Sequence, residues 1–162
     1  PSCEGKTLSV GCHWFNKDDA FCLSNPKDFE TIEIEPAYGL YGSPFKHYTG
    51  DFLKLKPDYK YNHILLFGVL GIPNLAQDDS DNYSMYGLEN DAITHADHLL
   101  SVGGTILLGP DISLDISRSK EDNINIWEEF IIKNKIIIEK YQLVNKFVTQ
   151  TNFIIIIKKN KH

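Results

Sequence analysis

A short apolar strand that stops at a glycine is the feature that most constrains what this chain can fold into. Residues 7–10 read TLSV, Gly11 follows, and Glu33 stands twenty-two positions further on in a second strand-like segment, residues 31–36 (TIEIEP). A strand, a glycine turn, a helix and a second strand with an acidic tip form the first half of a nucleotide-binding α/β unit. In such a unit the glycine lets the backbone approach the ligand, and the carboxylate accepts hydrogen bonds from ribose hydroxyls.

Size and composition fit one soluble globular domain that covers residues 1–162. The chain is 42% hydrophobic and 23% charged, and its net charge of −6 argues against a nucleic-acid backbone as main partner. Its three cysteines are odd in number and lack metal-ligand spacing, so we expect reduced thiols, no metal and a cytoplasmic location. We also expect no membrane partner, because no apolar run approaches the roughly 20 residues of a membrane span.

Hydrophobic periodicity predicts an alternation of strands and helices. We expect strands near residues 6–10, 30–34, 46–49, 63–69, 105–108, 142–149 and 152–158, and helices near 17–23, 88–100 and 122–140. Residues 101–104 (SVGG) should cap the second helix. The turn at residues 150–151 is too short for a helical crossover, so the last two strands should pair antiparallel. An exposed final strand could then pair between two copies of the chain.

In this order the segments resemble the motifs of class I S-adenosylmethionine (SAM)-dependent methyltransferases. The resemblance covers most of the chain and rests on residues 8–12 (LSVGC), 31–36 (TIEIEP), 50–52 (GDF), 67–70 (FGVL) and 99–108 (LLSVGGTILL). It implies an α/β fold, with a three-layer Rossmann-like sheet of about seven strands that is mostly parallel and has its last strand antiparallel. It also implies SAM as the cofactor.

The resemblance assigns roles to individual residues. Glu33 matches the ribose-binding acid, Asp51 and the apolar residue after it match the adenine contacts, and residue 67 lies where the fourth strand meets the methyl donor. The residues implied to bind the cofactor are therefore Gly11, Cys12, Glu33, Asp51, Phe52 and Phe67. His13 follows the first motif and is the best-placed candidate for a catalytic base or substrate contact, although a loop histidine is more often a polar turn residue.

Charge favours SAM over a dinucleotide. A pyrophosphate needs several glycines and the positive end of a helix, whereas here Gly11 stands without a second glycine, and Asp18 and Asp19 occupy the expected start of the helix. Two carboxylates there would repel phosphates, whereas the sulfonium cation of SAM suits an acidic pocket.

The missing second glycine, replaced by His13 and Trp14, also fits a catalytically silent methyltransferase-like scaffold.

Each candidate residue has a purely structural alternative. Asp51 could simply cap a turn, Phe52 could belong to the core, and Glu35 competes with Glu33 for the ribose. Asp91, His95 and His98 lie one helical turn apart, a spacing that could suit a metal, but burial of the apolar positions of this helix leaves Asp91 and His98 on or near its solvated face. We expect methyl transfer to a small-molecule or glycan-type acceptor, in a chain that could be a homo-oligomer or the partner of another subunit.

Overall fold

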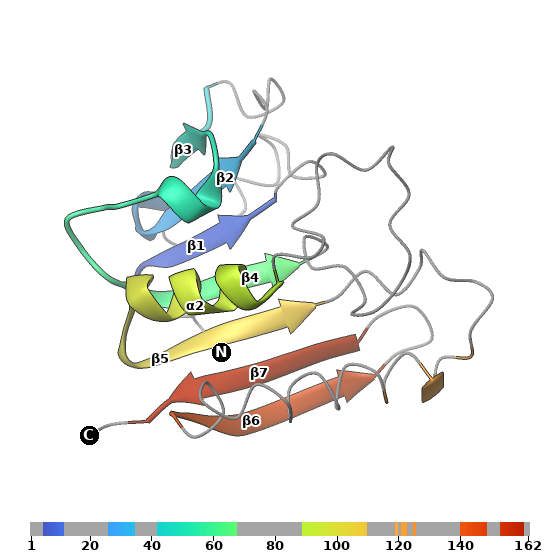
Figure 1. Ribbon diagram of the computed structural model, residues 1–162. Coiled ribbons are helices and arrows are strands. Elements are labelled where there is room, and N and C mark those ends of the chain that lie inside the picture. Colours follow the sequence, from blue (N-terminus) through green and yellow to red (C-terminus); the bar gives the residue numbers. More distant parts are fainter. Residues whose placement is uncertain are drawn as a thin grey trace.

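The computed structural model describes residues 5–11, 26–34, 42–67, 89–109, 119, 121–122, 125, 140–148 and 153–160 (Figure 1). Its seven strands form one sheet in the order β3-β2-β1-β4-β5-β7-β6. The strands are β1 (Thr7–Val10), β2 (Phe29–Glu33), β3 (Lys46–Thr49), β4 (Tyr61–Phe67), β5 (Leu100–Gly109), β6 (Tyr141–Val148) and β7 (Phe153–Lys159). Two 3-10 turns, η1 (Pro26–Asp28) and η3 (Phe52–Lys54), and one α-helix, α2 (Glu89–Leu99), are also described.

Strand directions confirm the predicted Rossmann-like sheet. Strands β3, β2, β1, β4 and β5 pair parallel to their neighbours, and β7 pairs antiparallel to both β5 and β6. Strand β6 therefore runs in the common direction, and β7 is reversed (Figure 1). The carboxyl ends of β1, β2, β3, β4 and β5 consequently meet at a single edge of the sheet, called the carboxyl edge below.

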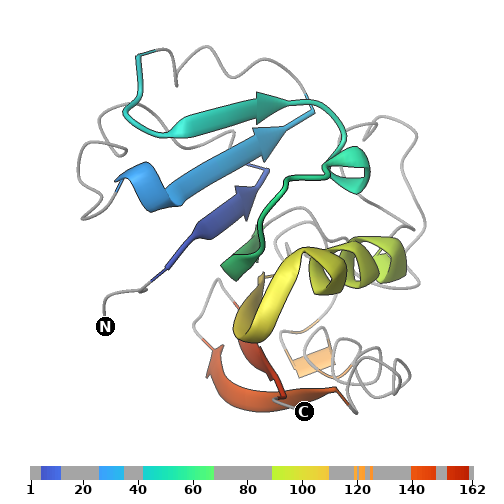
Figure 2. The same ribbon diagram turned by 90° about the vertical axis from the view of Figure 1, so that its left-hand side faces the viewer.

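One face of the sheet packs against α2. Because side chains alternate across a strand, Leu8, Ile64 and Ile106 share this face, and each is 0% exposed. The helix lays Ala92 and Ala96 onto it, both also 0% exposed, and these small side chains let the helix approach the strands closely. Each fully buried leucine or isoleucine contributes about 1.5–3 kcal/mol to folding. The buried side chains of this face and of α2 form one hydrophobic core, which holds the strands in place. Figure 2 shows α2 and η3 on the same side of the sheet.

Predicted and observed elements mostly agree to within two residues. Strand β3 begins and ends as predicted, and the predicted helix at 88–100 is α2, one residue shorter at each end. The predicted helix at 17–23 and most of that at 122–140 lie outside the described residues. None of the helices in the described part of the chain has the length and apolar character that a membrane span requires.

The prediction for residues 101–104 was wrong. They do not cap the helix but form the amino end of β5, which begins at Leu100 directly after α2. Leu100 pairs with Tyr61, and the Ser101 hydroxyl donates a hydrogen bond to the Tyr61 carbonyl oxygen at 3.0 Å. The register with β4 shifts between Leu100 and Thr105, and Gly103, in this irregular stretch, adopts a φ of 79°. Long-range strand pairing thus outweighs the local turn preference of the two glycines.

The idea of an exposed final strand was also wrong. Strand β7 lies between β5 and β6, so its backbone is paired on both sides, and the edge on that side is β6. Leu143 and Val144 of β6 are 59% and 54% exposed.

Candidate functional site

Hydrogen bonds join the tips of three strands at the carboxyl edge. The Gly11 amide, just after β1, donates to the Ile32 carbonyl oxygen of β2 at 2.9 Å. The Gly50 amide, just after β3, donates to the Glu33 carbonyl oxygen at 2.8 Å. Gly11 has a φ of 74°, a left-handed conformation that glycine adopts without steric cost. The structure therefore brings Gly11, Glu33 and Asp51 to one edge, next to one another across the sheet.

Glu33 ends β2 as a buried carboxylate. It is 5% exposed, and its Oε1 accepts a hydrogen bond from the amide of Ile34 at 3.1 Å. The Glu33 side chain lies on the sheet face opposite α2. His47 of the neighbouring strand β3 has its side chain on the same face. Burial lowers the pKa of His47 although the negative charge of Glu33 acts to raise it, so the imidazole is held neutral. A buried carboxylate at a strand end is suited to accept hydrogen bonds from sugar hydroxyls.

Asp51 caps the turn that follows β3. Its Oδ1 accepts a hydrogen bond from the Leu53 amide at 2.9 Å, and the turn continues through Lys54 N to Asp51 O at 3.0 Å. Asp51 therefore caps this turn, as the structural alternative proposed, and it does so through one of its two carboxylate oxygens. Asp51 is exposed, whereas Phe52 is 2% exposed and its ring belongs to the hydrophobic core.

His95 of α2 contacts the turn that follows β3, and the sequence did not reveal this contact. Its Nε2 lies 2.9 Å from the Leu55 carbonyl oxygen, and its ring meets the Phe52 ring edge-on, with centroids 5.1 Å apart. The sequence pattern grouped His95 with Asp91 and His98, but both of these side chains are exposed. Among the described residues no group of histidines, cysteines and carboxylates is arranged to hold a metal ion.

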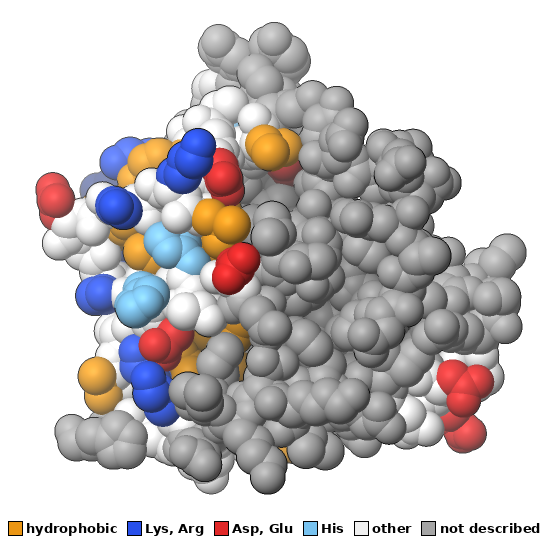
Figure 3. Space-filling view, in the orientation of Figure 1, with side chains coloured by type: hydrophobic (Ala, Val, Ile, Leu, Met, Phe, Trp, Pro, Cys, Tyr) orange, Lys and Arg blue, Asp and Glu red, His pale blue; other side chains and the backbone are white. Residues whose placement is uncertain are grey.

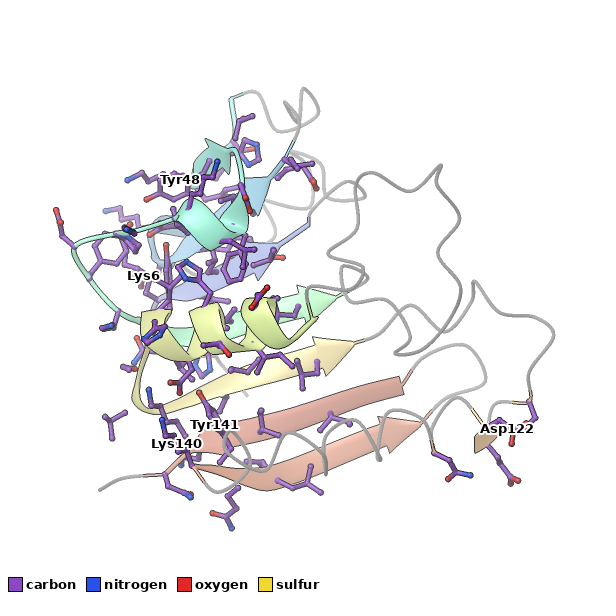
Figure 4. The ribbon with its side chains drawn as sticks, viewed as in Figure 1. Lys6, Tyr48, Asp122, Lys140 and Tyr141 are labelled. Atoms are coloured by element: carbon purple, nitrogen blue, oxygen red, sulfur yellow. The ribbon has the colours of Figure 1, made fainter. Side chains whose placement is uncertain are left out.

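A second buried carboxylate, Glu30, lies toward the amino ends of the strands. It is 1% exposed and accepts hydrogen bonds from the Tyr59 hydroxyl at 2.7 and 2.8 Å, from the Tyr61 hydroxyl at 3.0 Å, and from Lys6 Nζ at 3.1 Å. Figure 4 places Lys6 and Tyr48 here, and the Tyr48 hydroxyl continues the network to that of Tyr59 at 3.1 Å. Burial alone would raise the pKa of Glu30, but these donors hold it below its ordinary value.

Several described lysines lie where strands of the sheet begin. Lys6, Lys60 and Lys140 directly precede β1, β4 and β6, and Lys46 begins β3. Figure 3 shows lysine side chains gathered on the side where these strands begin. The carboxylates of Glu33 and Asp51 lie at the opposite, carboxyl edge, where Lys54 is also found in the turn after Asp51.

Three of the predicted site residues have no described side chain. Cys12 and His13 lie outside the described residues, and Phe67 is the last residue of β4, where its backbone pairs with Gly109. The cofactor-binding and catalytic roles of all the predicted site residues stay predictions.

Several solved structures with a similar chain path are methyltransferases. N-methyltransferase NodS from Bradyrhizobium japonicum WM9 has a TM-score of 0.60 and 14% identity over 97% of this chain and 86% of that one. NodS in complex with S-adenosyl-L-homocysteine (SAH) has a TM-score of 0.57 and 15% identity over 97% and 79% of the two chains.

Ribosomal protein L11 methylase from Lactobacillus delbrueckii subsp. bulgaricus has a TM-score of 0.59 and 14% identity over 98% of this chain and 72% of that one. The 16S rRNA methyltransferase RmtF, in complex with SAH, has a TM-score of 0.58 and 9% identity over 98% and 57%. No protein-family model matches the sequence, and no curated protein matches it either. The likeness therefore shows the fold, which is that of the class I SAM-dependent methyltransferases.

Proposed function

We propose that this chain is a SAM-dependent methyltransferase that binds SAM at the carboxyl ends of β1, β2 and β3. The observation that carries the proposal is the hydrogen-bonded grouping of a left-handed glycine, Gly11, with the buried carboxylate Glu33 and the turn at Asp51. Two further facts support it. The fold is shared with methyltransferases, and the two carboxylates lie at the edge opposite the lysines that begin the strands.

Each residue would hold a different part of the cofactor. Gly11 and Cys12 would let the backbone approach the ligand, because glycine offers no side chain at this turn. Glu33 would accept hydrogen bonds from the ribose hydroxyls, and the second carboxylate oxygen of Asp51 would accept one from the adenine amino group. Phe52 would support the adenine from beneath as part of the core, and Phe67 would lie near the methyl donor.

When bound, SAM supplies an electrophilic methyl group, and the task of the protein is to hold an acceptor atom in line with it. Holding two reactants in a productive geometry, with water excluded, can by itself supply several kcal/mol of the barrier reduction. A base is needed mainly when the acceptor is a hydroxyl, and His13 is our candidate for it. We propose a small-molecule or glycan-type acceptor, on the net charge of −6.

Calorimetric titration of the protein with SAM, and separately with SAH, tests the binding site. We expect saturable heat for both, and at least tenfold weaker binding by Glu33→Gln, because a hydrogen bond to a charged acceptor is worth about 1.5–3 kcal/mol. Asp58→Asn is the matched control, since Asp58 is an exposed carboxylate in the segment before β4. No heat at millimolar SAM would refute the proposal.

Incubation with methyl-labelled SAM and mixed small-molecule or glycan acceptors then separates an enzyme from a silent scaffold. A labelled product that disappears in Glu33→Gln supports the enzyme. Binding of SAM without label transfer to any acceptor class would favour the scaffold, for which the replacement of the second glycine by His13 and Trp14 is the motivating observation.

A further inference from the structure

The His95 side chain of α2 contacts the turn that follows β3, whose Phe52 also belongs to the hydrophobic core. His95 contacts this turn at two points, the Leu55 carbonyl oxygen at 2.9 Å from Nε2 and the Phe52 ring with centroids 5.1 Å apart and planes at 79°. A carbonyl oxygen can only accept, so Nε2 must carry the proton in this contact. The ring geometry is the edge-to-face arrangement that aromatic pairs prefer.

The turn has little stability of its own. Segment η3 is three residues long, and its internal bonds run from Lys54 N to Asp51 O at 3.0 Å and from Leu55 N to Phe52 O at 3.1 Å. Single 3-10 turns have poor hydrogen-bond geometry, and one helical turn costs more conformational entropy than its bonds return. Its position must therefore come from its anchors.

The anchors fix both ends of the turn. At the start, the Asp51 carboxylate binds the Leu53 amide, and the preceding Gly50 amide binds the Glu33 carbonyl oxygen. At the end, Leu55 is the C-cap residue, and its carbonyl oxygen is the group that meets His95. Because α2 is pinned to the sheet by Ala92 and Ala96, both 0% exposed, His95 transmits the position of the core to this turn.

We propose that His95 is a positioning residue that places Asp51 and Phe52 for the adenine end of the cofactor. The proposal rests on the proposed function, because it assumes that adenine binds beside Asp51. His95 touches neither adenine nor the reacting atoms in this scheme; it acts through Leu55 and Phe52. Removing it leaves Glu33 and Gly11 in place, so the loss should be selective for the base of the cofactor rather than for its sugar.

Three variants separate the two contacts. His95→Gln retains an N–H donor of similar reach, His95→Phe retains the aromatic contact without the donor, and His95→Ala removes both. His98→Ala is the matched control, because His98 is an exposed histidine on the same helix. The affinities for SAH and for S-inosylhomocysteine, in which an oxo group replaces the adenine amino group, are measured by calorimetry for every protein.

We expect His95→Phe and His95→Ala to bind SAH about three- to tenfold more weakly, a loss of the size of one hydrogen bond. Their binding of S-inosylhomocysteine should change less, so that the preference for the adenine form shrinks, and His95→Gln should recover most of it. Equal losses for both ligands, or unchanged affinity in His95→Ala, would overturn the proposal.

Hydrogen exchange gives a readout that needs no ligand. The amides of Leu53, Lys54 and Leu55 should exchange faster in His95→Phe than in the unsubstituted protein, while the amides of β4 keep their protection. Unchanged exchange at these three amides would show that His95 does not hold the turn. If these amides exchange faster in His95→Phe but the unsubstituted protein binds no SAH, the proposed function fails, while the conclusion that His95 holds the turn stands.

Discussion

Replacement of Glu30 by alanine should strongly destabilise the fold, although Glu30 lies away from the proposed cofactor site. The carboxylate is 1% exposed, and both of its oxygens accept hydrogen bonds, from Tyr59, Tyr61 and Lys6. Glu30→Ala leaves these donors without their acceptor on the face of the sheet that Glu30 shares with Leu8. The Lys6 ammonium also lies over the Tyr59 ring at 4.5 Å, so its position depends on the same group.

The structure sets the expected size of this effect. Removing one partner of a buried charged pair costs about 3–5 kcal/mol, and bonds to a charged acceptor are worth about 1.5–3 kcal/mol each without being additive. The Lys6 side chain is 29% exposed, so solvent screens that pair, and the tyrosine bonds carry most of the effect. We expect Glu30→Ala to lower the free energy of unfolding by about 3–5 kcal/mol, which lowers Tm by about 6–20 °C for a chain of this length.

Acid should reduce the difference in unfolding free energy between the unsubstituted protein and Glu30→Ala. The folded-state pKa of Glu30 is lowered from 4.5, so its charged interactions stabilise the fold above that pH and are lost as the pH falls below it. The gap in stability between the unsubstituted protein and Glu30→Ala should therefore be full at pH 7 and narrower at pH 3–4.

Urea denaturation followed by circular dichroism at both pH values measures the gap, with Asp58→Ala as the control. Asp58 is exposed, so its replacement should change stability by less than about 0.5 kcal/mol. A cost below about 1 kcal/mol for Glu30→Ala at pH 7, or a gap that does not narrow in acid, would refute this account of the cluster.

Three further substitutions test other parts of the structure. Gly11→Ala should cost about 1–2 kcal/mol in urea denaturation, because its φ of 74° is strained for any other residue, and a cost near zero would mean that the turn is not left-handed. Gly104→Ala should cost about 1–3 kcal/mol in thermal unfolding, since an added Cβ would lie 2.8 Å from the Asn62 carbonyl oxygen. Tyr141→Phe removes a 2.6 Å hydrogen bond to Asp97 and should cost about 1–2 kcal/mol. Although burial acts to raise the pKa of Asp97, the Tyr141 hydroxyl helps to hold it low, so NMR titration of Tyr141→Phe should show that pKa rising; an unchanged value would contradict this role.

Local sequence pattern was sufficient for most of the sheet. Residues 46–49 were predicted with their observed ends, and the apolar run after Asn62 marked β4 as a central strand, which it is. The short turn at residues 150–151 allowed only an antiparallel pairing, and β6 and β7 pair in that way. These features depend on side-chain alternation and on loop length, which are properties of neighbouring residues.

Residues 101–104 were predicted wrongly because their structure depends on strand pairing with a distant segment. Two glycines after a helix locally favour a cap, but strand pairing on both sides of them, Leu100 with Tyr61 and Thr105 with His63, places them within β5 at a register shift. The place of β7 inside the sheet is of the same kind, because only the packing of the whole sheet determines which strand is left at the edge.

By itself, the sequence predicted the ends of β1, β2 and β3 to within one residue, and hence that Gly11, Glu33 and Asp51 share one edge. Only the tertiary structure could decide the environment of each, since burial and hydrogen bonding depend on partners far away in the chain. In the folded chain, buried Glu30 accepts hydrogen bonds from tyrosines about thirty positions away. His95 of α2 likewise contacts the turn after β3, forty positions away. Neither contact leaves a pattern in the sequence, because each joins two segments that are unremarkable on their own.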